Sequence, residues 1–329
     1  MKLFLLTFNA ICLLFASQIS QAQVHHAAIL IDAENGNVLH EVDATQSWYP
    51  ASLTKLMTLY MTFDALSNRQ IHLQDTLRTS RHAARQPNSR LGLHYGEHLT
   101  VEDAILALIT RSANDASVVL AEHLAVTEDN FAIRMTAKAH SLGMYNTYFM
   151  NATGLPNDWQ VTTARDMALL ALKLQRNFPE YYGYFGAHSF IFKGRGLNGI
   201  NKFTANYEGA EGMKTGFTCN SGYNLVSSAR QNGRRLIGVI LGGRTSNERY
   251  NLMINQMDHG FAGDYNVVAN INTMPTDSAG LPPHQLGCAS GSSSYDEPEV
   301  HHRHGHGHHH HHLVTHTKSK AHHSRHNHR

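Results

Sequence analysis

Short apolar runs bounded by turn residues occur near both ends of the chain, a pattern that is typical of buried strands. These runs occupy residues 27–31, 38–40, 190–193, 223–228 and 235–241. Two connections carry an Asn-Gly pair, Asn35–Gly36 and Asn232–Gly233, which favours a tight hairpin between the flanking strands. Because strands come from both ends with helices between them, we expect one antiparallel sheet.

Over the middle of the chain, apolar residues recur every three or four positions, as they do on one face of a helix. Helices are predicted from Ser52, after Thr100, over residues 116–124, over 162–176 and over 247–261. Thr100 and Asp103 have the spacing of a capping box. The helix that follows is expected to stop at residues 111–114, which leaves Ser112 and Asn114 at a break where side chains can face a cleft.

Together these elements predict an α/β fold of the α+β kind, with an antiparallel sheet flanked by helices and a mainly helical lobe. The hydrophobic content of 42% is sufficient for a proper core. We divide the chain into a signal peptide at residues 1–22, a folded domain at residues 23–270 and a disordered His-rich tail at residues 271–329.

The first residues have the pattern of a secretory signal. Lys2 supplies the charged end, residues 3–16 are mostly apolar but short for a membrane span, and residues 20–22 form a small-residue cleavage site. No later stretch is long and apolar enough for a transmembrane helix. The pattern therefore predicts an exported protein.

Charge and cysteine content change this picture little. The formal net charge of +2 shows no signature of nucleic-acid binding. Beyond Cys12 in the apolar run, only Cys219 and Cys288 remain, and in an oxidising compartment they could pair. Because Cys288 lies in a Gly- and Ser-rich stretch, the sequence does not favour that disulfide.

The tail has the most unusual composition. Residues 301–329 contain fourteen His and five Lys or Arg but no acidic residue. Imidazoles at this density bind borderline metals such as Zn or Ni. The candidate ligands are His301, His302, His304, His306, His308, His309, His310, His311 and His312. The plainer alternative is a solubilising tail without a ligand, and protonated imidazoles could also hold the protein near anionic wall polymers or a membrane surface.

Ser52 and Lys55 are the first candidates for chemistry. They are three residues apart, so at a helix start both side chains lie on one face. A partly buried amine can be neutral and accept the proton of a neighbouring hydroxyl, and the helix N-terminus favours the developing oxyanion. The spacing alone is weak evidence, because a solvent-facing Ser and Lys at this separation are common.

Two further polar clusters follow in the chain, Ser112-x-Asn114 and Lys214–Thr215–Gly216. Ser-x-x-Lys, Ser-x-Asn and Lys-Thr-Gly in this order are the set found in penicillin-binding proteins and class A β-lactamases. The sequence resembles the low-molecular-mass penicillin-binding proteins, the serine D-alanyl-D-alanine carboxypeptidases of the peptidase S11 type. The resemblance includes residues 49–58, 112–116, 151–156, 212–218 and 222–226, and it covers about residues 27–261.

The resemblance implies a β-lactamase and penicillin-binding transpeptidase-like fold and a serine D,D-carboxypeptidase activity. Such an enzyme removes the terminal D-alanine from peptidoglycan pentapeptides through an acyl-enzyme and is inhibited by penicillin. Ser52 would be the nucleophile and Lys55 its general base, while Ser112, helped by Lys214, would relay a proton to the leaving amine. No cofactor is implied for catalysis.

Substrate binding is implied in the same way. Asn114 would hold the amide of the acyl chain. Lys214, Thr215 and Arg249 would bind the terminal carboxylate, and the backbone N–H groups of Ser52 and Thr218 would form an oxyanion hole. The expected partners are peptidoglycan stem peptides and β-lactams as inhibitors, in the periplasm or cell envelope of a bacterium.

Two departures from the family affect these expectations. Better-known members carry a second, all-β domain and a C-terminal amphipathic anchor, whereas this chain has no room for that domain and no apolar stripe in its last residues. Attachment to the membrane through the C-terminus is therefore not expected. The loop at residues 151–156 contains no Glu of the kind that class A β-lactamases use for deacylation, so efficient β-lactam hydrolysis is not expected.

Two alternatives remain beside the carboxypeptidase. A D,D-endopeptidase that cuts peptidoglycan crosslinks would use the same residues, and the choice depends on how open the cleft is. A periplasmic metal-binding or β-lactam-sensing protein could keep the fold without turnover.

Overall fold

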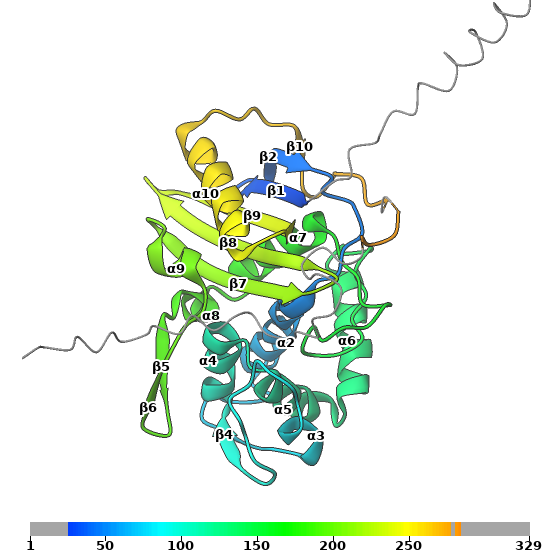
Figure 1. Cartoon of the computed structure of the whole chain (residues 1–329), viewed down its shortest axis with the longest axis vertical. Helices are drawn as coiled ribbons and strands as arrows, with labels where there is room; N and C mark the ends of the chain where they lie inside the picture. Colours follow the sequence, from blue (N-terminus) through cyan, green and yellow to red (C-terminus); the bar gives the residue numbers. More distant parts are fainter. Residues whose placement is uncertain (1–25, 278–279, 284–329) are drawn as a thin grey trace, which may run out of the picture. The chain divides into compact units, whose positions relative to one another are not determined.

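A six-stranded antiparallel sheet crosses the part of the chain that the computed structural model describes, residues 26–277 and 280–283 (Figure 1). Its strands are β1 (Ala27–Asp32), β2 (Asn37–Val42), β7 (Ala210–Thr218), β8 (Gly222–Gln231), β9 (Arg234–Gly243) and β10 (Ala269–Asn270), in the spatial order β10-β2-β1-β9-β8-β7. β1 pairs with β2 on one side and with β9 on the other, where Ala27 lies opposite Leu241. The predicted antiparallel sheet, with strands from both ends of the chain, is therefore confirmed.

All residues of β1 are buried, because its side chains alternate between two apolar clusters. Ile29 belongs to the cluster that contains α7 (Ala164–Asn177). Leu30 belongs to the cluster that contains Met253 of α10 (Ser246–Ala262). The sheet thus lies between α7 and α10, and the predicted α/β architecture is confirmed (Figure 1).

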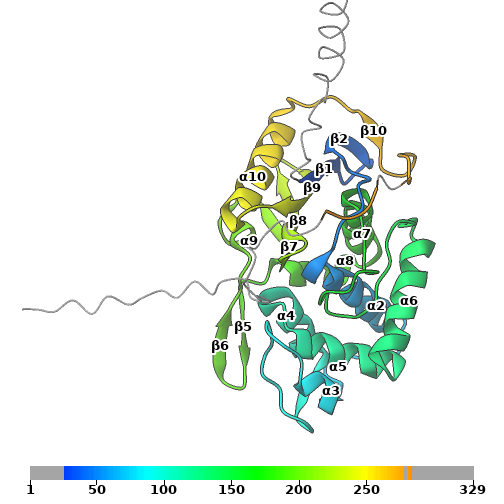
Figure 2. The same cartoon turned by 45° about the vertical axis from the view of Figure 1, so that its right-hand side comes forward.

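Most remaining helices form a lobe next to the sheet (Figures 1 and 2). They are α2 (Lys55–Ser67), α3 (Arg81–Ala84), α4 (Val101–Arg111), α5 (Asn114–Ala125) and α6 (Glu128–Ser141). The predicted capping box is present, since Thr100 Oγ1 accepts from the Asp103 N–H at 3.0 Å. The predicted break between α4 and α5 is also present, and Ser112 within it has a left-handed backbone with φ of 55°.

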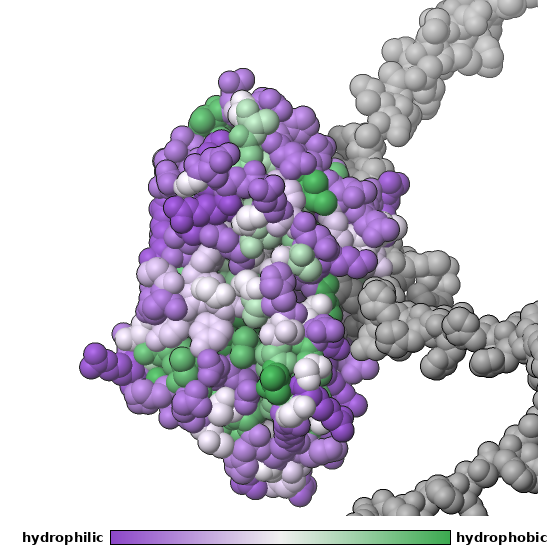
Figure 3. All heavy atoms as spheres, turned by 90° about the vertical axis from the view of Figure 1, so that its left-hand side faces the viewer, coloured by the Kyte–Doolittle hydropathy of each residue, from purple (hydrophilic) through white to green (hydrophobic). Residues whose placement is uncertain are grey.

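Short elements complete the described residues. They are the two-stranded pairs β3 (Thr76–Arg78) with β4 (His98–Thr100) and β5 (Ser189–Phe192) with β6 (Arg195–Asn198), and the single turns α8 (Pro179–Tyr182), η2 (Gly183–Gly186) and α9 (Lys202–Asn206). The β5–β6 hairpin projects from the body in Figure 2. The face shown in Figure 3 is mainly hydrophilic, with apolar side chains in small patches. Within the described ranges, no helix has the length and apolar character needed to cross a bilayer.

The structure differs from the sequence prediction in three places. Lys214 lies in a strand, β7, whose Gly and polar residues did not give a strand pattern. Ile271 and Met274 are buried in the main apolar cluster, so packed residues continue beyond the predicted domain end at residue 270. Cys219 is disulfide-bonded, although the sequence did not favour a bond; no other cysteine lies in the described ranges.

Candidate active site

A cleft lies between β7, the turn that carries Ser52 and the break between α4 and α5. Its walls are formed by Ser52, Asn88, Ser89, Ser112, Asn114, Gly154, Leu155, Ile200, Thr215, Gly216, Phe217 and Thr218. Lys55 and Lys214 are buried and contact Ser52 and Ser112, respectively. The structure therefore brings the three predicted polar clusters together at one cleft.

Ser52 lies on a 3-10 turn, η1 (Ala51–Thr54), immediately before α2, where the sequence predicted an α-helical start. In a 3-10 turn residues i and i+3 are eclipsed, so the side chains of Ser52 and Lys55 lie one above the other. Lys55 Nζ is 3.1 Å from Ser52 Oγ, 2.7 Å from Asn114 Oδ1 and 2.6 Å from the Thr153 carbonyl oxygen. The amine is thus surrounded by one hydroxyl and two carbonyl oxygens.

Burial lowers the pKa of Lys55 well below its usual value, and the nearby Lys214 cation lowers it further. The carboxylates of Asp115 and Glu128 act in the opposite direction. A neutral amine has two N–H groups and one lone pair, which match the two carbonyl acceptors and the Ser52 hydroxyl around Nζ. This geometry suits transfer of the Ser52 proton to Lys55.

Acylation of Ser52 should slow as the pH falls through the lowered pKa of Lys55, because protonated Lys55 has no lone pair for the hydroxyl proton. We expect the rate of labelling by a fluorescent penicillin to rise with pH along this acid limb. Circular dichroism at each pH checks that the protein is folded. A flat rate from acid to alkaline pH in folded protein would mean that a different group is the base.

A second Lys–Ser pair lies across the cleft. Lys214 Nζ donates to Ser112 Oγ at 2.9 Å and to the Thr215 carbonyl at 2.8 Å. Because a hydroxyl both donates and accepts, Ser112 next to this ammonium can pass a proton to a group bound in the cleft.

Two glycines let the cleft walls approach the backbone that carries Ser52. A Cβ on Gly216 of β7 would lie 3.0 Å from Ser52 N, and a Cβ on Gly154 would lie 1.9 Å from the Ala51 carbonyl oxygen. Gly154 also has φ of +85°, in the left-handed region that favours glycine. Strand β7 and the loop at residues 151–155 therefore pack directly on the turn that carries Ser52, called the nucleophile turn below after its predicted role.

Asn114 is held at the cleft by contacts within the protein. Its Oδ1 accepts from Lys55 if the amine donates, and its Nδ2 donates to the carbonyls of Pro87 and Asn88 at 3.0 and 3.2 Å. These contacts position Lys55, while the role of Asn114 in holding a substrate amide stays a prediction.

Thr218 and Arg249 are engaged in contacts within the protein. The Thr218 N–H, which was predicted for the oxyanion hole, donates to Ser221 Oγ at 2.9 Å. Arg249 is fully buried, and its guanidinium donates to the Asn224 carbonyl and the Tyr250 hydroxyl. These contacts do not test the two assignments, which stay predictions.

Sequence reasoning missed several residues of this site. The Thr153 carbonyl contacts Lys55, but a backbone carbonyl gives no side-chain signal, and only the resemblance over residues 151–156 pointed to this loop. Ile200 and Phe217 line the cleft, yet their apolar side chains look like core positions in the sequence.

Comparison with known proteins agrees with this geometry. Residues 16–245 match the family described as D-alanyl-D-alanine carboxypeptidase, peptidase S11. The chain is 38% identical to the D-alanyl-D-alanine carboxypeptidase DacC of Escherichia coli, over 68% of this chain and 58% of that protein. It spans about three fifths of the length of the curated relatives that it matches.

Solved structures are similar as well. Penicillin binding protein 5 from Haemophilus influenzae has a TM-score of 0.70 and 33% identity, over 74% of this chain and 73% of that chain. Penicillin-Binding Protein D2 from Listeria monocytogenes, in its cefotaxime-bound form, has a TM-score of 0.66 and 31% identity, over 71% of this chain and 96% of that chain. With the family match over most of its length, the chain belongs to the D-alanyl-D-alanine carboxypeptidase family, peptidase S11.

Proposed function

We propose that this protein is a serine D,D-carboxypeptidase that removes the terminal D-alanine from peptidoglycan pentapeptides through an acyl-enzyme on Ser52. The observation that carries the proposal is the 3.1 Å contact between Ser52 Oγ and the buried Lys55 Nζ. The Lys214–Ser112 pair at the same cleft and the family membership support it.

In the proposed reaction, Ser52 Oγ attacks the carbonyl carbon between the two D-alanines and gives its proton to Lys55 Nζ. The carbon–nitrogen bond of the tetrahedral intermediate then breaks, while Ser112, next to Lys214, passes a proton to the leaving amine. Water hydrolyses the ester on Ser52, which restores the hydroxyl and releases the shortened peptide.

The charged groups of the substrate require fixed partners. We assign the terminal carboxylate to Lys214, Thr215 and Arg249, because a carboxylate is recognised by cations and hydroxyls. We assign the oxyanion of the intermediate to the backbone N–H groups of Ser52 and Thr218. The N–H groups would stabilise the charge that develops as Ser52 attacks.

β-Lactams are the proposed inhibitors, since the Listeria relative was solved with cefotaxime bound. They would acylate Ser52 in place of the substrate. Serine peptidases of this family need no cofactor, and family members are proteins of the cell envelope. We propose the periplasm or cell envelope for this chain too; its predicted signal peptide, residues 1–22, lies outside the described residues.

Incubation with purified peptidoglycan, followed by mass analysis of the soluble products, tests the proposal. We expect free D-alanine and stem peptides shortened by one residue, and neither should form with a Ser52→Ala variant. Cleaved crosslinks without free D-alanine would instead identify a D,D-endopeptidase. No product at all would favour the metal-binding or β-lactam-sensing alternative.

We also propose that the His-rich tail binds Zn or Ni independently of catalysis. The fourteen His of this tail, all within residues 301–329, lie outside the described residues, so the proposal rests on the sequence. Truncation after Glu299 should remove most metal binding, measured by calorimetry with ZnCl₂, and leave D-alanine release nearly unchanged. Metal should also dissociate as imidazoles protonate near pH about 6.5. Loss of peptidase activity in the truncated protein would show that tail and catalysis are linked.

A further inference from the structure

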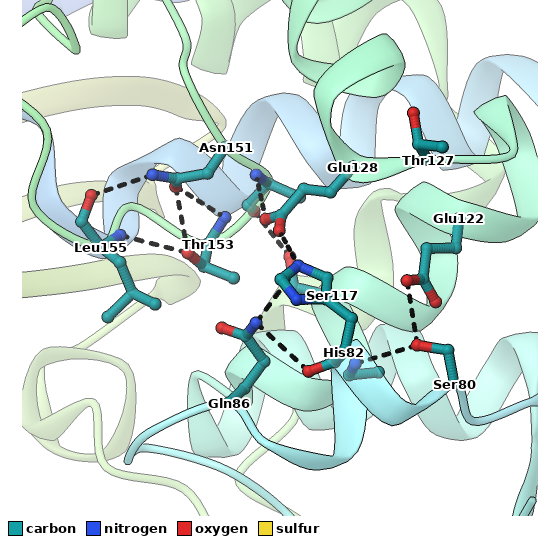
Figure 4. A network of polar contacts seen from close by, with 12 residues as sticks. Ser80, His82, Gln86, Ser117, Glu122, Thr127, Glu128, Asn151, Thr153 and Leu155 are labelled. Atoms are coloured by element: carbon teal, nitrogen blue, oxygen red, sulfur yellow. Dashed lines mark hydrogen bonds and ion pairs between the residues drawn. The ribbon is translucent and has the colours of Figure 1, made fainter. Parts of the chain in front are cut away.

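A carboxylate–imidazole pair lies behind the cleft and has no part in the proposed reaction steps (Figure 4). Glu128 is the first residue of α6, and its Oε1 accepts from the Ala152 N–H at 2.9 Å. Its Oε2 lies 2.6 Å from His82 Nε2. The Glu128 side chain is 11% exposed and that of His82 is 56% exposed, so the pair links a nearly buried carboxylate to solvent.

Ala152 belongs to the loop at residues 151–155 that packs on the nucleophile turn. Its carbonyl accepts from Thr58 Oγ1 at 2.8 Å and from Ser117 Oγ at 2.6 Å. The next carbonyl, that of Thr153, is the one 2.6 Å from Lys55 Nζ. No helix or strand contains these residues, so side-chain contacts of the loop position the Thr153 carbonyl. They are the contacts of Ala152 and the bonds from the Thr153 and Gly154 N–H groups to Asn151 Oδ1.

We propose that Glu128 is a positioning residue for Lys55. Through the Ala152 N–H it holds the loop one residue before Thr153, whose carbonyl contacts Nζ, and its negative charge, paired on the outer side with His82, stabilises the protonated form of Lys55. The inference rests on the proposed function, since it concerns the base of that reaction.

Of the two carboxylates that act on Lys55, that of Glu128 is held by fewer backbone N–H groups than that of Asp115. Three charged groups influence the pKa of Lys55: the Lys214 cation on β7 and the carboxylates of Asp115 on α5 and Glu128 on α6. The Asp115 carboxylate accepts four backbone N–H groups, those of Leu91, Gly92, Leu93 and Ala116. Within the described residues, Glu128 accepts one backbone N–H, that of Ala152, and its other oxygen contacts the exposed imidazole of His82.

Around His82, the Gln86 amide is neutral and 3.5 Å away, and Glu122 of α5 contacts α3 through Ser80 Oγ at 2.9 Å (Figure 4). Among these groups, Glu128 is the carboxylate that the His82 ring contacts directly.

The pH dependence of Ser52 labelling by a fluorescent penicillin tests this inference. Glu128→Gln keeps an oxygen that can accept from Ala152 but removes the charge, so the midpoint of the acid limb should move about 0.5–1 unit to lower pH. His82→Gln keeps an N–H donor for the Glu128 carboxylate but cannot carry a positive charge. The negative charge of Glu128 is then less compensated, so the midpoint of the acid limb should move to higher pH. A structural defect alone would lower the rate without moving the midpoints in opposite directions.

Asp129→Asn is the matched control. Asp129 is the exposed neighbour of Glu128 in the first turn of α6, so the same charge is removed at the same helix start but outside the pair. Its midpoint should equal that of the wild type. The inference holds if the wild-type midpoint lies between those of Glu128→Gln and His82→Gln; any other order overturns it. Absence of labelling in the wild type would instead contradict the proposed function.

Discussion

Ser52→Ala should abolish covalent labelling by a fluorescent penicillin, with a loss of roughly a thousandfold or more. The reason is that the acyl bond of the proposed intermediate forms on Ser52 Oγ, the hydroxyl 3.1 Å from Lys55 Nζ. The substitution removes one oxygen from a half-buried side chain and leaves Asn114 and Thr153 as partners of Lys55. The protein should therefore fold normally, and in-gel fluorescence measures the loss.

Ser67→Ala is the control for this experiment. Ser67 lies at the other end of α2, is exposed and donates to Glu180 Oε1 at 3.1 Å. This variant should label like the wild type. Persistent labelling of folded Ser52→Ala would assign the nucleophile to another residue.

Gly154→Ala should reduce the acylation rate about a hundredfold and lower the free energy of unfolding by about 2–4 kcal/mol. The added Cβ would lie 1.9 Å from the Ala51 carbonyl oxygen and 2.8 Å from Ser52 N. Both neighbours are backbone atoms, so either the loop or the nucleophile turn must move. Displacement of either one separates Ser52 from the groups around it. Penicillin labelling rates and urea denaturation measure the two effects.

Gly143→Ala separates the steric clash from backbone strain. Gly143 has φ of +90°, but a Cβ there would meet only Leu169 Cδ2, at 3.5 Å. We expect a loss of about 1 kcal/mol from the left-handed backbone and a normal acylation rate. Equal acylation rates in the two variants would mean that the contact between Gly154 and Ala51 does not position Ser52.

The elements that the sequence predicted correctly have local signals. Apolar runs and Asn-Gly turns marked the strands, and the Thr100–Asp103 spacing marked the start of α4. Strand β7 has no such signal, because its Lys214, Thr215 and Gly216 face the cleft and the nucleophile turn instead of an apolar layer. Its place in the sheet comes from pairing with the next strand, β8, across the short turn at residues 219–221, and not from an apolar pattern of its own.

The candidate site was predictable at the level of motifs. The three polar clusters meet as expected, and Ser112 lies at the expected helix break. The contacts of backbone groups were not predictable, because every residue carries a carbonyl and an N–H. The Thr153 carbonyl at Lys55 and the engaged N–H of Thr218 are therefore findings of the structure alone.

The position of β1 between β2 and β9 has a consequence for synthesis on the ribosome. β1 ends at Asp32, but its partner β9 begins only at Arg234, so most of the chain must emerge before the strand is paired on both sides. Until then, a strand that is apolar on both faces has one open edge, which favours aggregation. Such long-range pairing slows folding. In a nascent chain, the edge of β1 that pairs with β9 therefore stays open until β9 has been made.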